Sequence, residues 1–439
     1  MSTVRCSVFT GVLSAHVRVP GSKSITNRAL AIAAWADGTS LLRGALFAED
    51  AILMVQALRT LGIRITLDEP GRAMEVTGCR GHLPVEEAEL FCGNSGTVLR
   101  FLTALTATGR GEFRFDAAPR LRQRPVGELV STLQELGAGV EYAETAGCPP
   151  YTLRAAGLEG GHVTLVNPPS SQMVSALLLA APYAAADVFL AVRGQTPSMP
   201  YVRMTMNLME HFGVAVLAGS PEETAGSRYV VPASQRYTAQ TLAIEPDASA
   251  ATYFLAAAAV AGGEITIDGM GSASHQGDAG FASVLEKMGC HVDQTASSTT
   301  VRRDPAAELH GIDIDLNAMP DVVPTLAVTA LFADGPTTIR NVANLRLKES
   351  DRLAALGSEL SKVGATIEVT TDGLIIDPLV QSRPAVLETH NDHRLAMSFA
   401  LLGLRIPGIT ISGAECCAKT YPGFFTDWAA HVAPVDWLD

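Results

Sequence analysis

The sequence predicts an α/β protein built from six copies of one unit of about 75 residues. Residue types that favour helix starts recur before Ala- and Leu-rich segments, at Ser24, Gly96, Ser171, Ser249, Asp321 and His393. The steps between these positions are 72, 75, 78, 72 and 72 residues. A period of this length is typical of a repeat architecture in which each copy is one supersecondary unit.

The order of elements within each copy is also regular. After the first helix, a turn leads into a short β-type run at 38–42, 111–115, 186–190, 263–267, 335–339 and 408–411. A second helix then stops at Gly62, Gly137, Gly213, Gly289 or Gly364, where a left-handed C-cap is expected. An alternating hairpin follows. The unit is therefore predicted as helix–strand–helix–strand–strand, with the sixth copy cut short by the C-terminus.

Length and hydrophobic patterning predict two soluble domains. A chain of 439 residues exceeds the size of one core, so two domains of three units each are the simplest division. The apolar stretch 173–192 is interrupted by Pro182 and Asp187. It is therefore interpreted as a buried helix and strand rather than a membrane span.

The charge distribution favours a small anionic ligand. A net charge of −13 disfavours nucleic acids and anionic membranes as partners. Cations nevertheless gather in a few short motifs, at Lys23, Arg28, Arg100, Arg124, Lys348, Arg352, Arg394 and Lys419. The seven cysteines are odd in number and lack CxxC spacing, and the first residues contain no long apolar region. These features predict a cytoplasmic protein without disulfides or a signal peptide.

Three helix starts are candidate anion sites, because a helix N-terminus presents unpaired N–H groups and partial positive charge. Lys23 and Ser24 lie in a predicted first turn, and Arg28 follows one turn later. Gly96 lets a ligand approach the backbone closely. Ser170, Ser171 and Gln172 offer two hydroxyls and an amide. The alternative for each start is ordinary capping, and Arg124 lies in a loop where an arginine is often only solvated.

Two carboxylates near cations are candidate acid–base groups. Asp321 stands at a helix start, and Glu349 stands between Lys348 and Arg352. A carboxylate beside cations stays ionised and accepts a proton from a hydroxyl. The alternative for Glu349 is a surface ion pair with Arg352. His390 and His393 have no third ligand at a clear spacing, so no metal is expected.

Eight segments, taken in order, resemble the 5-enolpyruvylshikimate-3-phosphate synthases, a family of enolpyruvyl transferases. They read PGSKSITNRAL, GNSGT-x-x-R, RQRP, PSSQ, MPD, KESDR, NDHR and AKTYPGFF, and the resemblance runs from about Gly11 to Phe425. It implies an inside-out α/β barrel fold of two three-unit domains, 1–20 with 243–439 and 21–242, and a site in the cleft between them. It also implies transfer of the enolpyruvyl group of phosphoenolpyruvate to the 5-hydroxyl of shikimate 3-phosphate. We expect a monomer that needs no cofactor.

The resemblance also implies roles for individual residues. Shikimate 3-phosphate would be bound by Lys23, Ser24, Arg28, Ser170, Ser171, Gln172, Ser198, Tyr201, Asp321, Asn344 and Lys348. Phosphoenolpyruvate would be bound by Lys23, Gly96, Arg124, Gln172, Arg352, Arg394 and Lys419, and Asn94 belongs to the same motif as Gly96. Asp321 would take the hydroxyl proton, and Glu349 with Lys23 would move protons at the methylene carbon.

Two other functions fit parts of the pattern. The sister enzymes that act on UDP-N-acetylglucosamine usually carry a cysteine in the loop before an Arg-Pro pair, where this chain has Pro119. A non-catalytic anion-binding paralogue is expected to have lost a carboxylate or a cation, yet Lys23, Asp321, Glu349 and Lys419 are all present. Phe101 follows the motif arginine where the best-known bacterial form has proline, which places the sensitivity to the inhibitor glyphosate in question.

Overall fold

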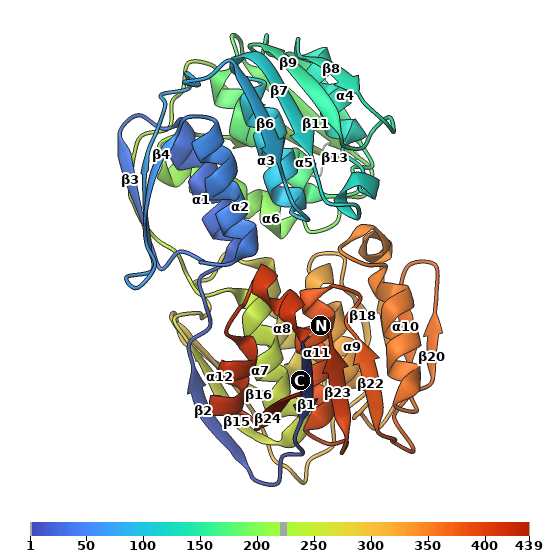
Figure 1. Ribbon diagram of the computed structural model, residues 1–439. Coiled ribbons are helices and arrows are strands. Elements are labelled where there is room, and N and C mark those ends of the chain that lie inside the picture. The colour runs from blue at the N-terminus through green and yellow to red at the C-terminus, as the bar shows by residue number, and fades with distance from the viewer. Residues whose placement is uncertain (1, 220–225, 439) are drawn as a thin grey trace. The chain divides into compact units, whose positions relative to one another are not determined.

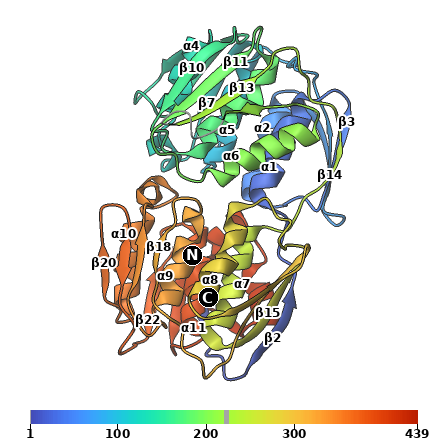
Figure 2. The same ribbon diagram turned by 180° about the vertical axis from the view of Figure 1, so that it is seen from behind.

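The structure, a computed structural model, describes residues 2–219 and 226–438 (Figures 1 and 2). The chain divides into two compact units. Unit 1 comprises Met1–Pro20 and Glu245–Asp439, and unit 2 comprises Gly21–Ile244. Each unit has its own hydrophobic core.

Unit 2 places three four-stranded sheets around three buried helices. The inner helices are α1 (Lys23–Trp35), α3 (Gly96–Thr106) and α5 (Ser171–Ala180). The outer helices are α2 (Glu49–Thr60), α4 (Gly127–Glu135) and α6 (Pro200–His211). In the first sheet the strand order is β14 (Thr241–Ala243), β3 (Thr39–Arg43), β5 (Ala73–Thr77), β4 (Arg64–Asp68). In the second it is β6 (Glu87–Phe91), β7 (Arg110–Asp116), β9 (Tyr151–Ala156), β8 (Gly139–Tyr142). In the third it is β10 (Gly161–Val166), β11 (Val188–Arg193), β13 (Gly226–Val231), β12 (Leu217–Ala218).

Unit 1 repeats this plan. The inner helices are α7 (Ala248–Ala261), α9 (Val323–Ala330) and α11 (His393–Gly403), and the outer ones are α8 (Phe281–Lys287), α10 (Arg352–Lys362) and α12 (Phe424–His431). In the first sheet of this unit the strand order is β2 (Leu13–Val17), β15 (Gly263–Asp268), β17 (Ser298–Arg303), β16 (His291–Gln294). In the second it is β18 (Asp313–Asp315), β19 (Thr337–Arg340), β21 (Leu374–Ile376), β20 (Ile367–Val369). In the third it is β22 (Ala385–Glu388), β23 (Ile409–Ser412), β1 (Thr3–Cys6), β24 (Val435–Leu438).

The repeated unit contains one strand more than the sequence predicts. In the β6–β7–β9–β8 sheet, β6 runs parallel to β7, and the other neighbours are antiparallel. The additional strand, called the leading strand, lies directly before an inner helix. It is short and half exposed, so its residues give only a weak strand signal in the sequence. Across the described residues the strands form six separate sheets rather than one continuous ladder.

The leading strands β2 and β14 are exchanged between the sheets, and the sixth copy is complete. β2 precedes α1 in the chain but pairs with β15, whereas β14 precedes α7 but pairs with β3. The prediction that the C-terminus truncates the last copy is wrong, because β1 pairs between β23 and β24. Pairing across the whole chain length supplies the missing strand, which local sequence cannot reveal.

Small side chains explain why the inner helices are enclosed on all sides. Every residue of α3 and α11 is buried, and α7 is buried from Ala248 to Val260. Alanine and threonine allow close helix packing and keep helix propensity acceptable. The second helices end as predicted, with positive φ at Gly62, Gly137, Gly213, Gly289 and Gly364.

The apolar stretch 173–192 forms a helix and a strand, as predicted. It comprises most of α5, the 3₁₀ turn Ala181–Tyr183 and most of β11. Among the described residues, none of the helices has the length and apolar character needed to cross a bilayer. All seven cysteines carry free thiols.

Candidate active site

Unit 1 collects its predicted site residues at the starts of its inner and outer helices. Asp321 lies in the 3₁₀ turn Pro320–Val322 before α9, and Arg394 lies in the first turn of α11. Lys419 ends the 3₁₀ segment Ala414–Lys419. The helix predicted around Lys348 and Glu349 begins only at Arg352, because Asp351 is its N-cap and accepts a hydrogen bond from the Ala354 N–H. The two residues therefore lie in the preceding loop, free of helical geometry.

Arg352 is the centre of the unit 1 cluster. Its guanidinium donates to Asp321 Oδ1 at 2.9 Å and to Glu349 Oε2 at 3.0 Å. A third carboxylate, Asp392, accepts from Nε at 2.7 Å. The Arg352 side chain is 1% exposed, so these are buried ion pairs. Burial alone would lower the pKa of Arg352, but the charges of Asp392, Glu349 and Asp321 raise it.

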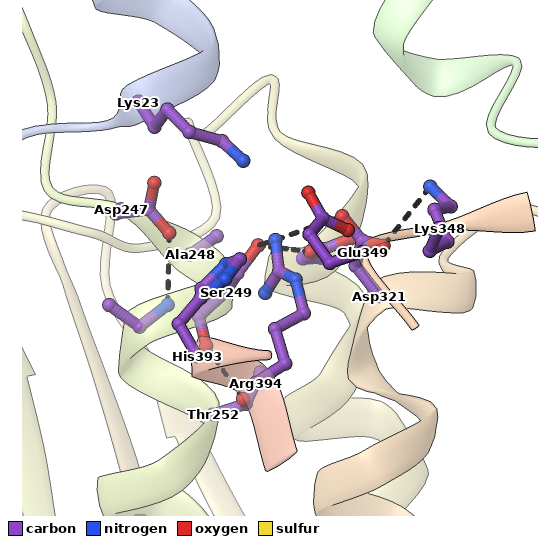
Figure 3. Close-up of polar contacts among 12 residues, drawn as sticks. Lys23, Asp247, Ala248, Ser249, Thr252, Asp321, Lys348, Glu349, His393 and Arg394 are labelled. Carbon is purple, nitrogen blue, oxygen red and sulfur yellow. Dashed lines mark hydrogen bonds and ion pairs between the residues drawn. The ribbon is translucent and has the colours of Figure 1, made fainter. Parts of the chain in front are cut away.

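Asp321 is held by three cations. Besides Arg352, Lys348 Nζ lies 3.2 Å from Oδ1, and Arg394 Nη2 donates to Oδ2 at 2.8 Å (Figure 3). Cations at these distances favour the ionised carboxylate, which is the form that accepts a proton.

Glu349 lies between two cations in a buried setting. Lys419 Nζ donates to Oε1 at 2.7 Å, and Arg352 donates to Oε2. The Glu349 side chain is 9% exposed and that of Lys419 is 7% exposed. The alternative of an ordinary surface ion pair is therefore wrong for Glu349.

The charge count of the cluster favours anions. Four cations, Lys348, Arg352, Arg394 and Lys419, are ion-paired with three carboxylates, Asp321, Glu349 and Asp392. These seven side chains therefore carry one more positive than negative charge, and most of them are buried. A low local dielectric strengthens the attraction of such a region for a phosphate or a carboxylate.

Unit 2 supplies a second set of predicted residues. Lys23 lies 3.6 Å from the nearly buried Asp50 carboxylate. Arg28 is buried, and its guanidinium donates to Thr205 Oγ1 at 2.7 Å and to the Ser24 carbonyl at 2.9 Å. It also stacks over Phe101 at 5.1 Å. The Arg28 guanidinium therefore lies below the surface of the helix, and its positive charge acts on an anion through space.

Gly96 lies against two arginines. A Cβ at this position would lie 2.6 Å from Arg100 Nη1 and 3.1 Å from Arg124 Nη2. Arg100 in turn donates to Gln172 Oε1 at 2.6 Å, and Gln172 donates to Thr97 Oγ1 at 3.1 Å. The starts of α3 and α5 are therefore tied together beside the glycine.

The capping alternative is correct for one of the predicted serines. Ser170 caps α5 by accepting from the Gln172 N–H at 3.3 Å, and Ser171 is the first helical residue. Ser198 adopts a left-handed φ of 61°, which is rare for serine and is often kept at functional sites. The backbone carbonyl of Ser198 accepts a hydrogen bond from the Tyr201 N–H at 3.0 Å, close to Arg28.

Two further predicted residues are asparagines. Asn344 lies in the 3₁₀ segment Ala343–Leu347, and its buried Oδ1 has no hydrogen-bond partner among the described residues. Asn94 is half-buried in the turn before α3.

The inner-helix starts of the two units are capped differently. Serine caps α1, α3 and α5 in unit 2, through Ser22, Ser95 and Ser170. Asp247 and Asp392 cap α7 and α11 in unit 1. A carboxylate cap offsets the positive end of a helix, so the serine-capped starts in unit 2 attract anions more strongly than the starts of α7 and α11.

Sequence reasoning missed three contacts. Asp392 belongs to a predicted helix start and to the NDHR segment, and in the structure it is fully buried and binds Arg352. Asp50 contacts Lys23, and Arg100 positions Gln172. Asp392 precedes an apolar helix by one residue, so its cap role was detectable, whereas its contact with Arg352 was not.

The histidine pair does not gather ligands. His390 Nε2 contacts Glu359 Oε1 at 2.9 Å, and His393 is buried at the start of α11. Within residues 2–219 and 226–438, no cluster of three or more His, Cys, Asp or Glu side chains has a metal-binding arrangement.

Comparison with known proteins identifies the family. The family model described as EPSP synthase (3-phosphoshikimate 1-carboxyvinyltransferase) matches residues 10–428. The chain belongs to this family. Over 426 residues it is 43% identical to the 3-phosphoshikimate 1-carboxyvinyltransferase of Nostoc punctiforme, covering 97% of this chain and 98% of that protein. Over 428 residues it is 44% identical to the chloroplastic enzyme of Solanum lycopersicum, covering 94% of this chain and 81% of that protein.

Solved structures agree on the fold. The chain superimposes on EPSP synthase from Acinetobacter baumannii with a TM-score of 0.82 and 25% identity, over the full length of both chains. The enolpyruvyl transferase NikO from Streptomyces tendae gives a TM-score of 0.77 at 19% identity, covering 99% of this chain and 98% of that one, which supports the fold alone.

Proposed function

We propose that this enzyme transfers the enolpyruvyl group of phosphoenolpyruvate to the 5-hydroxyl of shikimate 3-phosphate and releases phosphate, a step of aromatic amino-acid biosynthesis. Family membership carries the proposal. The buried Asp321 and Glu349, each held by cations, supply the acid–base groups that the reaction requires. Each substrate has a phosphate and a carboxylate, which fits the positive excess of the unit 1 cluster.

The reaction proceeds by addition and elimination. The 5-hydroxyl oxygen bonds to C2 of phosphoenolpyruvate while its proton passes to Asp321, and C3 gains a proton to become a methyl group. The tetrahedral adduct then loses phosphate from C2 and a proton from C3, which restores the double bond. Glu349, with Lys23, serves the proton transfers at C3. General acid–base groups of this kind contribute on the order of 100- to 10,000-fold.

The binding roles follow the family motifs position by position. The shikimate 3-phosphate set combines Lys23, Ser24, Arg28, Ser170, Ser171, Gln172, Ser198, Tyr201, Asp321, Asn344 and Lys348. The phosphoenolpyruvate set combines Lys23, Gly96, Arg124, Gln172, Arg352, Arg394 and Lys419. Arg352 and Arg394 already donate to Asp321, so they hold the proposed base beside the phosphoenolpyruvate groups.

A coupled phosphate-release assay tests the function. We expect release that depends on both phosphoenolpyruvate and shikimate 3-phosphate, and none with UDP-N-acetylglucosamine. Release with the sugar nucleotide would instead support the sister enzyme. Binding of both ligands by calorimetry without release would support the non-catalytic paralogue.

We expect the two units to approach each other when ligands bind. The proposed ligands of shikimate 3-phosphate include Lys23 and Ser171 from unit 2, and Asp321 and Lys348 from unit 1. A small molecule bound by all four residues would bring the two units together, which also excludes water. Small-angle scattering should give a smaller radius of gyration with shikimate 3-phosphate than without it. An unchanged radius at saturating ligand would contradict closure.

We further expect inhibition by glyphosate, which occupies the phosphoenolpyruvate site beside Gly96 in this family. Gly96→Ala adds a methyl group 2.6 Å from Arg100 Nη1, so the Arg100 guanidinium must move and the methyl group takes up space beside residue 96. The mutant should lose affinity for the longer inhibitor more than for phosphoenolpyruvate. Competition kinetics of both proteins measure this. Resistance of the wild type to millimolar inhibitor, or equal inhibition of both, would contradict the role given to Gly96.

We also infer a cytoplasmic monomer that acts on small molecules without a cofactor. Size-exclusion chromatography with light scattering should give a mass near 46.1 kDa. A mass of twice that value would contradict the monomer.

A further inference from the structure

A buried carboxylate outside the family motifs is linked through Ser249 to the unit 1 cluster. Asp278 lies in the 3₁₀ turn Gly277–Gly280 and is 1% exposed. Its Oδ2 accepts a hydrogen bond from the Ser249 hydroxyl. Its Oδ1 is buried and has no hydrogen-bond partner among the described residues. An ionised carboxylate in such a setting is costly for the fold, because one oxygen loses its hydration without replacement.

Ser249 connects Asp278 to the proposed reaction groups. Arg394 Nη2 donates to Ser249 Oγ at 3.3 Å and to Asp321 Oδ2 at 2.8 Å. The hydrogen-bonded chain therefore runs from Asp278 through Ser249 and Arg394 to Asp321. Figure 3 shows Ser249, Arg394 and Asp321 in this arrangement.

The direction of each hydrogen bond depends on the charge of Asp278. An ionised carboxylate only accepts, so the single Ser249 proton points toward Asp278 and the oxygen lone pairs face Arg394. A protonated Asp278 can donate instead. The Ser249 proton would then no longer be held toward Asp278, and the hydroxyl would be less firmly oriented for its contact with Arg394.

The loop that carries Asp278 is fixed on the start of α7. Gln276 is buried, its Oε1 accepts from the Ala248 N–H at 3.1 Å, and its Nε2 donates to the Pro246 carbonyl at 2.7 Å. Ser249 is the second residue of the same helix. The separation between Asp278 and Ser249 is therefore fixed by two hydrogen bonds that do not involve either of them.

We propose that Asp278 is a positioning residue for the reaction, which through Ser249 fixes the guanidinium of Arg394 between the proposed phosphoenolpyruvate site and Asp321. This inference rests on the proposed function, because it assigns Arg394 and Asp321 their roles there. Asp278 itself contacts no group that is expected to touch a substrate. Second-layer contacts of this kind typically contribute about 10- to 100-fold to activity.

The electrostatics of the site agree with a functional rather than a stabilising role. Burial and, to a smaller extent, the charge of Asp321 raise the pKa of Asp278 to about 6, against the opposing effects of Arg394 and the Ser249 hydrogen bond. Asp247, the cap of α7, is the other charged group that raises it. A carboxyl whose pKa is raised in the folded state stabilises the fold when protonated. That stability is lost as the pH rises from 3.8 to about 6.

The test compares Asp278→Asn, Ser249→Ala and the double variant with the wild type. Asp278→Asn keeps an acceptor for Ser249 but removes the charge. We expect kcat/KM for phosphoenolpyruvate to fall about 10- to 100-fold, with KM for shikimate 3-phosphate within about twofold. Because both changes interrupt one chain, the double variant should be no worse than the poorer single variant. Asp268→Asn, an exposed carboxylate paired with His16, is the matched control and should keep full activity.

Thermal unfolding separates positioning from a structural role, and does so without substrates. The Tm of Asp278→Asn should equal or exceed that of the wild type at pH 7, and the difference should widen as the pH rises from 3.8 to about 6. A lower Tm with equal losses toward both substrates would overturn the proposal, as would unchanged kinetics or additive losses in the double variant. Absence of turnover in the wild type would instead contradict the proposed function, and the Tm comparison would still decide whether the fold requires the Asp278 charge.

Discussion

Replacement of Glu349 by glutamine is expected to reduce kcat on the order of 100- to 10,000-fold while leaving shikimate 3-phosphate affinity nearly unchanged. Glutamine keeps the shape, but its single carbonyl oxygen accepts from only one of Lys419 and Arg352, which lie 2.7 and 3.0 Å from the two Glu349 oxygens. It cannot carry the transferable proton. Steady-state kinetics measure kcat, and calorimetry measures the binding of shikimate 3-phosphate.

The chain offers a closely matched control in Glu359. Glu359 is 2% exposed, pairs with Lys362 at 2.6 Å with i,i+3 spacing, and also contacts His390. It has no proposed role in the reaction. Glu359→Gln should therefore keep turnover within about twofold, although it removes one buried ion pair. Equal turnover in the two variants would return Glu349 to the role of a structural ion-pair partner.

Arg352→Gln is expected to produce the largest loss of folding stability, about 3–5 kcal/mol. The reason is that Asp321, Glu349 and Asp392 would lose their shared cation. The side chain of Asp392 is 0% exposed, so solvent cannot replace the lost charge. Arg352→Lys keeps the charge but not the planar fork that reaches three carboxylates, and its loss should be intermediate. Urea unfolding measures the free energies.

The control for this loss is a surface arginine of the same unit. Arg340 pairs with Asp313 at 2.7 Å, and both side chains are more than half exposed. Arg340→Gln should cost less than about 1 kcal/mol, because water screens such pairs. A similar loss in Arg340→Gln and Arg352→Gln would show that the burial of the cluster has little energetic consequence. Arg352→Gln should also reduce turnover, since Arg352 holds both proposed acid–base groups.

Local residue types were sufficient to predict the repeat, most of the element types and the chemical class of the site. The helix starts near Ser24, Gly96 and Ser171 and the glycine stops depend on contacts within one or two turns, so local residue types fix them. The motif order identified the family, and Lys348, Arg352 and Glu349 were candidates from their spacing alone.

Which of these residues come into contact depends on the tertiary fold and could not be predicted from local sequence. The β1 strand completes the last sheet, and β2 and β14 are exchanged, because strand pairing joins segments hundreds of residues apart. Arg352 reaches Asp392 forty positions away, and Ser249 joins Asp278 to Arg394. A buried charge is stable only beside a partner that the fold brings to it, and that partner leaves no signal at a fixed spacing in the sequence.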